Sequence, residues 1–253
     1  MSFKSWRAFR EFEHHVKTEF RFSLNPESKE FLAELARTSS SREKLIKKGS
    51  FLWRAQLGHG WHTEDHGELE LEVPGPYSAE RMKPVLRRAK EGRVNPKGIP
   101  FLYLSTDRDT AMSETRPWMG ETVSVAQFEV NNDIEVIDFS QDAEIKSILE
   151  WYFEEPDEDV REQSIWAQIN HAFSTPITVS DNSADYVVTQ LIAEVFRAKG
   201  FKGIAYRSSL GEGTNVALFD LSSADPVNCF LYEARDIRFE FSEAANPWFL
   251  AKS

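Results

Sequence analysis

A short apolar strand that runs directly into a capped helix, residues 98–114, constrains this chain more than any other stretch. Residues 101–105 have the apolar pattern of a buried strand, and Asp107 is a typical N-cap for the helix that follows. Side chains at the strand end and on the first helical turns of such a unit can reach one cleft. Tyr103 and Glu114 are therefore candidates for that cleft, although such residues, taken alone, more often serve packing and a solvated surface.

The length and the aromatic content predict a globular protein with a large core. The chain has 253 residues, enough for one large domain or two small ones. It is 41% hydrophobic and contains 19 Phe and 7 Trp residues. Because aromatic rings bury large apolar areas, we expect a core built mainly from rings.

The charge and the cysteine content exclude several classes of protein. The net charge of -11, without a long basic block, argues against nucleic acid as a partner, whereas local cations could still hold a small anion. Cys229 is the single cysteine, so an internal disulfide and a Cys-rich zinc site are excluded. No signal-peptide core and no run of about 20 apolar residues is present. We expect a cytoplasmic protein that does not interact with a membrane.

The first 48 residues are predicted to form a helical extension ahead of a main domain at residues 49–253. Apolar residues at spacings of three and four predict an amphipathic helix over residues 3–20, and Asn25-Pro26 starts a second helix. The apolar stripe either packs on the rest of the protein or docks a partner or a second copy, as in a homo-oligomer. Its members are Phe3, Trp6, Phe9, Phe12, Val16 and Phe20.

Three stretches ahead of the strand at 101–105 contain residue types that occur in binding sites. Arg54 lies inside an apolar strand, residues 51–57, and an unpaired buried charge is costly, so it requires either a structural carboxylate or an anionic ligand. His62 and His66 have the spacing of a zinc-binding helix, but the surrounding glycines predict a polar loop and no metal site. Residues 92–98 form a Gly/Asn/Pro loop whose amides could face a ligand, although loops of this composition are more often only turns.

The remaining pattern predicts an α+β fold, because strands and helices are mixed without regular alternation. We expect a hairpin from strands 121–130 and 134–139, joined by the turn at 131–133. The other expected elements are a short helix in 78–90, helices at 142–173 and 185–199, a loop at 175–182, and strands at 203–206, 216–220 and 237–241.

Three blocks, in this order, resemble the RES domain family, which is named for an Arg, a Glu and a Ser. The resemblance covers about residues 50–220 and includes Tyr186-x-x-x-Gln190 ahead of the third block. The first block is Trp53-Arg54, and the second runs from Gly92-Arg93-Val94-Asn95 through Leu102-Tyr103-Leu104 to Glu114. The third is Gly203-Ile204-Ala205-Tyr206-Arg207-Ser208-Ser209 with Asn215-Val216-Ala217-Leu218-Phe219.

The resemblance implies a fold similar to that of ADP-ribosyltransferase toxins, with a split and strongly bent sheet around an NAD cleft. It also implies that NAD⁺ is a substrate, cleaved at the nicotinamide–ribose bond, with no further cofactor. Many members of the family are bacterial toxins, which a neighbouring antitoxin with a helix-turn-helix domain blocks. The implied function is a growth-arresting NAD⁺ glycohydrolase.

The family's functional residues can be carried onto matching positions. Arg54, Glu114 and Ser208 match the Arg, Glu and Ser, and Tyr103 matches an aromatic of the nicotinamide pocket. Ser209 beside Ser208 leaves the choice of hydroxyl open. The sequence also departs from the family, which often has Trp where Val94 stands and Pro where Arg207 stands. Further candidates for NAD binding are Arg93, Gln190, Tyr206 and Ser209.

The chemistry of the implied reaction suits these residue types. Cleavage passes through a cationic sugar, so Glu114 would supply a negative charge near the ribose. Arg54 would bind the pyrophosphate with two parallel hydrogen bonds, and Arg93 is a second candidate for that role. Tyr103 would stack on nicotinamide, whereas Tyr206 is either near it or part of the core.

Two other functions remain open. A protein ADP-ribosyltransferase would use the same residues and differ only in the acceptor. A non-catalytic binding protein on the same fold would dock through the N-terminal apolar stripe.

Overall fold

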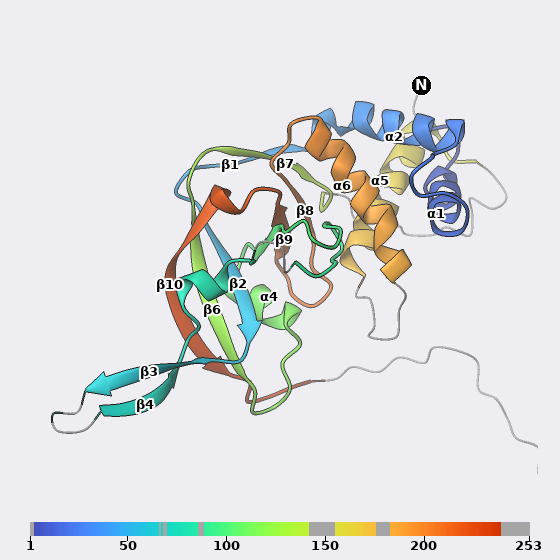
Figure 1. The fold of residues 1–253 in the computed structure, drawn as a ribbon. Helices are drawn as coiled ribbons and strands as arrows, with labels where there is room; N and C mark the ends of the chain where they lie inside the picture. The colour runs from blue at the N-terminus through green and yellow to red at the C-terminus, as the bar shows by residue number, and fades with distance from the viewer. Residues whose placement is uncertain are drawn as a thin grey trace, which may run out of the picture.

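The computed structural model describes residues 3–238 except 66, 68–69, 86–88, 142–154 and 176–182. An eight-stranded sheet with helices packed against it forms the main body, which confirms the α+β prediction (Figure 1). The elements are α1 (Ala8–Thr18), α2 (Pro26–Thr38), η1 (Ser39–Arg42), β1 (Glu43–Ile46), β2 (Phe51–Leu57), β3 (Gly60–Asp65), β4 (Glu70–Gly75), α3 (Ala79–Met82), β5 (Leu102–Ser105), α4 (Arg108–Glu114), β6 (Thr122–Val130), β7 (Ile134–Asp138), α5 (Glu158–Ser174), η3 (Ser183–Tyr186), α6 (Val187–Ala198), β8 (Gly203–Arg207), β9 (Thr214–Leu218), η4 (Leu221–Ser223) and β10 (Ala224–Glu233).

The main sheet is strongly bent. Its strand order is β1-β7-β8-β9-β5-β2-β6-β10, so β6 and β7, although consecutive in sequence, lie far apart in the sheet. Strands β1 and β2 pair with β7 and β6 in one register, from Glu43 opposite Ile137 to Leu57 opposite Val123. The two segments therefore form one long antiparallel ribbon, which bends at residues 47–50 and 131–133.

This bend shows that the predicted hairpin of residues 121–139 is wrong. The strands are present, but β6 pairs with β2 and β10, and β7 pairs with β1 and β8. The turn residues 131–133 carry the chain around the bend instead of folding it back. Turn propensity indicates that the chain changes direction, and it does not specify which strands then pair.

The N-terminal apolar stripe packs inside the protein. Phe3, Trp6, Phe9, Phe12 and Val16 are all buried, so the packing interpretation is confirmed for these residues. The last member of the stripe, Phe20, lies beyond the end of α1 and is 59% exposed.

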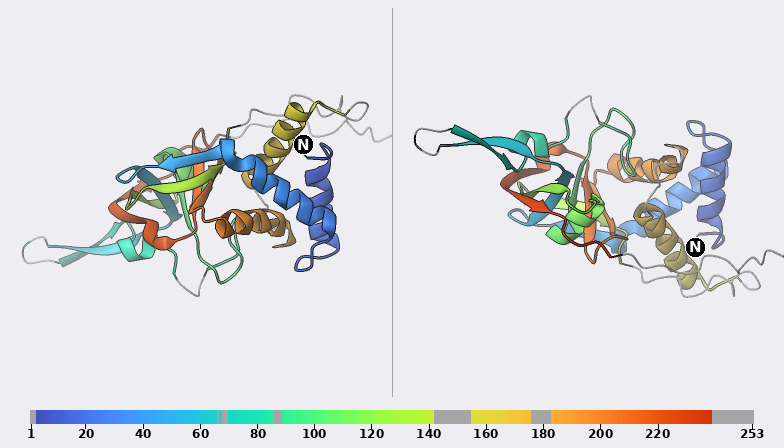
Figure 2. Two further views of the ribbon diagram at one scale, coloured as in Figure 1. Left: turned by 90° about the horizontal axis from the view of Figure 1, so that it is seen from above. Right: turned by 90° about the horizontal axis from the view of Figure 1, so that it is seen from below.

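The helices gather at one end of the molecule and cover an aromatic core. Helices α1, α2, α5 and α6 lie together there, at the end opposite the β3–β4 hairpin (Figures 1 and 2). The prediction of a ring-rich core is confirmed. Its buried rings are Phe3, Phe9, Phe12, Phe31, Phe101, Phe139, Trp166, Phe173, Phe196, Tyr206 and Phe219.

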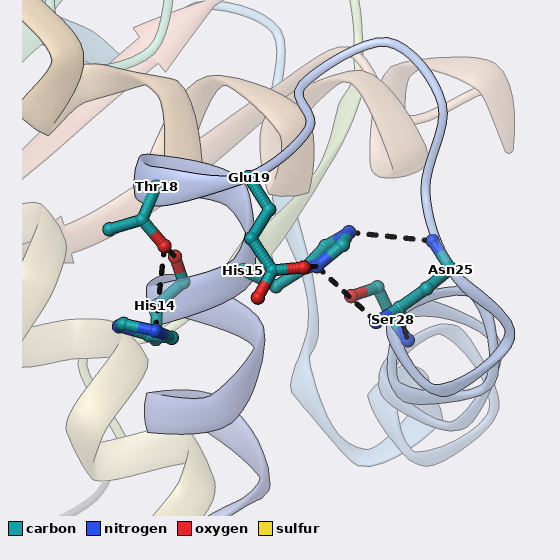
Figure 3. Close-up of polar contacts among 6 residues, drawn as sticks. All are labelled: His14, His15, Thr18, Glu19, Asn25 and Ser28. Carbon is teal, nitrogen blue, oxygen red and sulfur yellow. Dashed lines mark hydrogen bonds and ion pairs between the residues drawn. The ribbon is translucent and has the colours of Figure 1, made fainter.

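A buried histidine joins α1 to the start of α2. The Nδ1 atom of His15 lies 3.0 Å from Glu19 Oε2 and 3.3 Å from Asn25 Nδ2 (Figure 3). Asn25 also caps α2, because its side-chain oxygen accepts a hydrogen bond from the Ser28 backbone amide at 2.8 Å. The predicted helix start at Asn25-Pro26 is therefore confirmed, and the turn between the two helices is fixed at both ends.

Three predicted segments differ from the structure. The stretch after β2 is a hairpin, β3–β4, and not a loop, and His62 Nε2 lies 2.7 Å from the Pro76 carbonyl oxygen. Residues 43–46, included in the helical extension, form the edge strand β1. The closing edge strand is β10, not residues 237–241, of which 237 and 238 have no regular structure.

Some predictions fall on residues outside those described. They are residues 86–88 of the short helix predicted in 78–90, His66, the first part (142–154) of the helix predicted at 142–173, the loop after Thr175 and the end of the strand predicted at 237–241. Among the described helices, none is both long and apolar enough to span a bilayer.

Candidate functional site

The carboxylate at the centre of the site is carried by a short, well-capped helix. Asp107 accepts a hydrogen bond from the Thr110 backbone amide at 2.8 Å and so caps α4, as predicted. Leu102 and Leu104, on the preceding strand β5, are buried in the sheet core and anchor the strand. Glu114, the last residue of α4, is thereby held at a fixed distance from the strand end.

One oxygen of Glu114 is held by two side chains from distant parts of the chain. Its Oε1 atom accepts hydrogen bonds from Ser208 Oγ at 2.7 Å and from Asn215 Nδ2 at 2.6 Å. The other oxygen, Oε2, accepts no hydrogen bond from the described residues. The half-buried carboxylate therefore keeps one oxygen for another donor.

Ser208 is fully engaged by hydrogen bonds. Its hydroxyl donates to Glu114 and accepts from the backbone amides of Leu210 and Gly211, each at 3.1 Å. Ser209 instead donates to the Ser174 carbonyl at 3.0 Å. The geometry thus pairs Ser208, and not Ser209, with the carboxylate. Because the Ser208 hydroxyl already donates its hydrogen bond to Glu114, Ser208 is suited to orienting that carboxylate and not to nucleophilic attack.

A glycine allows the loop that contains Ser208 to pack closely against the start of α4. The Gly213 amide donates to Thr110 Oγ1 at 2.9 Å. A Cβ at Gly213 would lie 1.8 Å from Asp107 Oδ2, so no other residue fits there without displacement. The same capped turn that begins α4 therefore also fixes the loop that carries Ser208.

Asn215 is the residue of this cluster that the sequence analysis did not single out. It begins the buried part of β9, and Ser105 on β5 donates to its Oδ1 atom at 2.8 Å. Both side chains are about 95% buried. The available signal was a polar residue at the head of an otherwise apolar strand, inside the third family block, but such a residue is usually a turn residue.

Arg54 lies where the sheet splits. Strands β2 and β5 share a single residue pair, Trp53 opposite Ser105, and the Arg54 guanidinium donates from Nη1 to the Tyr103 carbonyl at 2.9 Å beside that pair. Its Nε atom is buried and has no hydrogen-bond partner among the described residues. Burial lowers the pKa of Arg54 to about 10, so the group is still a cation at neutral pH.

Direct contacts join two of the three family residues. Glu114 and Ser208 are in contact, whereas no hydrogen bond or ion pair joins Arg54 to either of them within the described residues. No carboxylate of the described residues pairs with Arg54 either. Of the two partners considered for it, the structural carboxylate is therefore not observed in the described part of the chain.

Tyr103 is held through its hydroxyl by the Gly-rich loop. The hydroxyl donates to Asn95 Oδ1 at 2.7 Å and accepts from the Val94 amide at 3.0 Å. Burial raises the pKa of Tyr103 above its usual range. Gln190 holds the same loop, because its Nε2 atom donates to the carbonyls of Gly92 at 2.9 Å and Asn95 at 3.0 Å. Gln190 thus stabilises the conformation of the loop through its backbone carbonyls.

Arg93 and Tyr206 connect this loop to the aromatic core. Arg93 Nη1 donates to the Phe173 carbonyl at 3.0 Å, at the end of α5. Tyr206 is 3% exposed, and its ring centre lies 5.7 Å from that of Phe173. Burial, opposed by the charge of Arg93 and reinforced by the Glu114 carboxylate, raises the pKa of Tyr206 to about 12. The structure thus shows Tyr206 as a core residue.

The match to a family model agrees with the sequence resemblance. The RES domain matches residues 52–242. A chain of the crystal structure of the M. tuberculosis MbcT-MbcA toxin-antitoxin complex aligns with 79% of this chain and 92% of its own length, at 14% identity and a TM-score of 0.39. No match is found among curated proteins. The match over residues 52–242 spans most of the sequence, and the chain belongs to the RES domain family.

Proposed function

We propose that this protein is an NAD⁺ glycohydrolase that cleaves the bond between nicotinamide and ribose. The observation that carries the proposal is the Glu114 carboxylate, which has one oxygen fixed by Ser208 and Asn215 and the other available. A fixed negative charge is what a cationic sugar needs as its bond to the leaving group breaks. The leaving nicotinamide is neutral, so no acid is required to protonate it.

Arg54 supports the same proposal. A dinucleotide has two negative phosphates, and a guanidinium can meet them with two parallel hydrogen bonds. Arg54 has a buried Nε without a protein partner among the described residues. An anionic ligand that reached this atom would relieve a costly unsatisfied donor. In this proposal Tyr103 borders the nicotinamide, and Arg93 is a second candidate for contact with the pyrophosphate.

The test is nicotinamide release from NAD⁺ by the purified protein. We expect release by the wild type and a loss of about 10²- to 10³-fold in Glu114→Gln, which keeps the shape of the side chain but removes its charge. Glu114→Ala should be at least as inactive. Equal rates in wild type and Glu114→Gln would show that Glu114 is not the catalytic carboxylate.

The acceptor distinguishes hydrolysis from protein ADP-ribosylation. NAD⁺ labelled in its ADP-ribose part should yield free ADP-ribose in the presence of cell lysate if water is the acceptor. Label fixed on a protein would identify a transferase instead. No NAD⁺ binding and no turnover would support a non-catalytic binding protein.

The proposed biological role is that of a growth-arresting toxin in the bacterial cytoplasm, which follows from the family and from NAD⁺ consumption. Induced expression of the wild type should stop growth and lower cellular NAD⁺, whereas Glu114→Ala should do neither. The proposed partner is an antitoxin with a helix-turn-helix domain, encoded next to this protein. Co-expression with that neighbour should restore growth, and failure to do so would remove it as the partner.

A further inference from the structure

We propose that Ser105 and Asn215 form a relay that positions Glu114, with Asn215 as a positioning residue and Ser105 as its support. The proposal rests on the catalytic role proposed for Glu114. In this proposal, the two residues determine which oxygen of the Glu114 carboxylate is available to the substrate. Neither residue needs to touch the substrate to do this.

The direction of each hydrogen bond supports the relay. An amide side chain can present either its oxygen or its NH₂ group to a neighbour. Ser105 donates to Asn215 Oδ1 at 2.8 Å, which turns the NH₂ group toward Glu114 Oε1 at 2.6 Å. The opposite orientation would bring the amide oxygen against the carboxylate, and two acceptors repel each other. Ser105 therefore sets the orientation in which Asn215 can donate.

The burial of the relay shows that these bonds hold the groups in place. Ser105 is 4% exposed and Asn215 is 5% exposed. Buried polar groups are costly unless hydrogen bonded, and the neighbouring strand residues Leu104 and Val216 are apolar. A water molecule or a mobile side chain cannot easily replace either partner there. The two groups keep one arrangement because other arrangements leave a buried polar atom unpaired.

Two donors on one oxygen have a geometric consequence for the other. Ser208 alone would let the Glu114 carboxylate turn about a single bond. Ser208 lies in the loop after β8 and Asn215 lies on β9, so the two bonds together fix the plane of the carboxylate and leave Oε2 in one position. A misplacement of about 1 Å at a reacting group can cost about 100-fold in rate.

The experiment measures kcat and KM for nicotinamide release in Ser105→Ala and Asn215→Ala. We expect kcat to fall about 10- to 100-fold in each, with KM changed less than about 2-fold, because the substrate contacts are kept. Ser105→Thr retains the hydroxyl and should recover most of the rate. The control is Asn228→Ala, which removes an exposed strand asparagine that donates to Gln127 and should leave kcat unchanged.

A second measurement detects the hydrogen bonds of the relay independently of enzyme activity. The side-chain amide NMR resonance of Asn215 should shift in Glu114→Gln and in Ser105→Ala, relative to the wild type. If the wild type releases no nicotinamide but these shifts occur, the proposed function fails and the relay stands. The relay is wrong if the Asn215 resonance does not shift in Ser105→Ala. It is also wrong if the wild type is active and both alanine variants have the same kcat as the wild type.

Discussion

The two charged groups of the proposed site differ in how the protein satisfies them. Glu114 receives two short hydrogen bonds on one oxygen, from side chains that are themselves buried and bonded. Arg54 makes one hydrogen bond, to a backbone carbonyl, and its buried Nε has no partner among the described residues. The fold thus fixes the position of the Glu114 carboxylate, whereas the hydrogen bonding of the Arg54 guanidinium is incomplete.

This difference indicates a division of work within the site. Catalysis benefits from a group that is fixed before the substrate arrives, because no reorganisation is then needed. Binding benefits from a group with unused donors, because the ligand supplies what the protein lacks. The contrast predicts that changes at Arg54 act mainly on substrate affinity, whereas changes around Glu114 act mainly on the rate.

Apart from changes to Glu114 itself, the largest effect should come from Arg54→Met. The variant removes the guanidinium but keeps an apolar side chain of similar length, so NAD⁺ affinity should fall about 100-fold, as for loss of a buried charge pair. The free energy of unfolding should change by less than about 1 kcal/mol, because loss of the bond to Tyr103 is offset by removal of an unpaired donor. Calorimetric titration with NAD⁺ and urea denaturation measure the two quantities.

Arg81→Met is the matched control for that prediction. Arg81 lies on the nearby helix α3, and its guanidinium bonds to Gln56 and stands over the Tyr77 ring. Because its charge already has partners in the protein, its removal should leave NAD⁺ affinity nearly unchanged. Equal losses in the two variants would show that general charge, and not the Arg54 site, attracts the substrate.

The next largest effect should come from Gly213→Ala, on the Glu114 side. The added Cβ would collide with the Asp107 carboxylate that caps α4, so the Ser208 loop or the cap must move. We expect a loss of about 1–3 kcal/mol in the free energy of unfolding, together with a lower kcat. Gly98→Ala is a useful comparison, because a Cβ there meets no atom within 4 Å, although its positive φ of 88° adds backbone strain. A fully active and stable Gly213→Ala would contradict the close packing of this loop.

The smallest effect concerns the pH dependence of stability through Tyr206. Its pKa in the folded protein is raised to about 12, mainly by burial, above the usual value of about 10. Between these values the unfolded chain loses the proton and the folded protein keeps it, so stability must fall as pH rises. Urea denaturation of wild type and Tyr206→Phe from pH 8 to 11 should show a steeper decline for the wild type. Parallel curves would contradict the buried, neutral state of Tyr206.

The sequence predicted elements that depend on local chemistry. Asp107 caps α4, Asn25 caps α2 and Gly200, with a φ of 100°, ends α6, because each of these roles depends on near neighbours alone. The family blocks likewise placed Glu114 and Ser208 in one site before any distance was known. Their contact at 2.7 Å agrees with that placement.

The features that sequence reasoning missed depend on long-range pairing. Strand β10 was missed because Pro226 and Asn228 interrupt its pattern, yet an edge strand tolerates a proline and a bulge. The β6–β7 hairpin was predicted wrongly because local turn signals do not reveal that one register continues across a bend. Asn215 was missed because its importance comes from Ser105 and Glu114, which are about 100 residues away in sequence.

A crystal structure of the Glu114→Gln variant with NAD⁺ bound would test most directly whether Arg54 and Glu114 belong to one NAD⁺ site. We expect one dinucleotide that contacts both charged groups, with its pyrophosphate on Arg54 and its nicotinamide-bearing ribose beside residue 114. The donor that is unpaired in the protein alone should then bond to a phosphate oxygen. NAD⁺ bound elsewhere, or bound beside residue 114 while the Arg54 Nε stays buried and unpaired, would contradict this expectation.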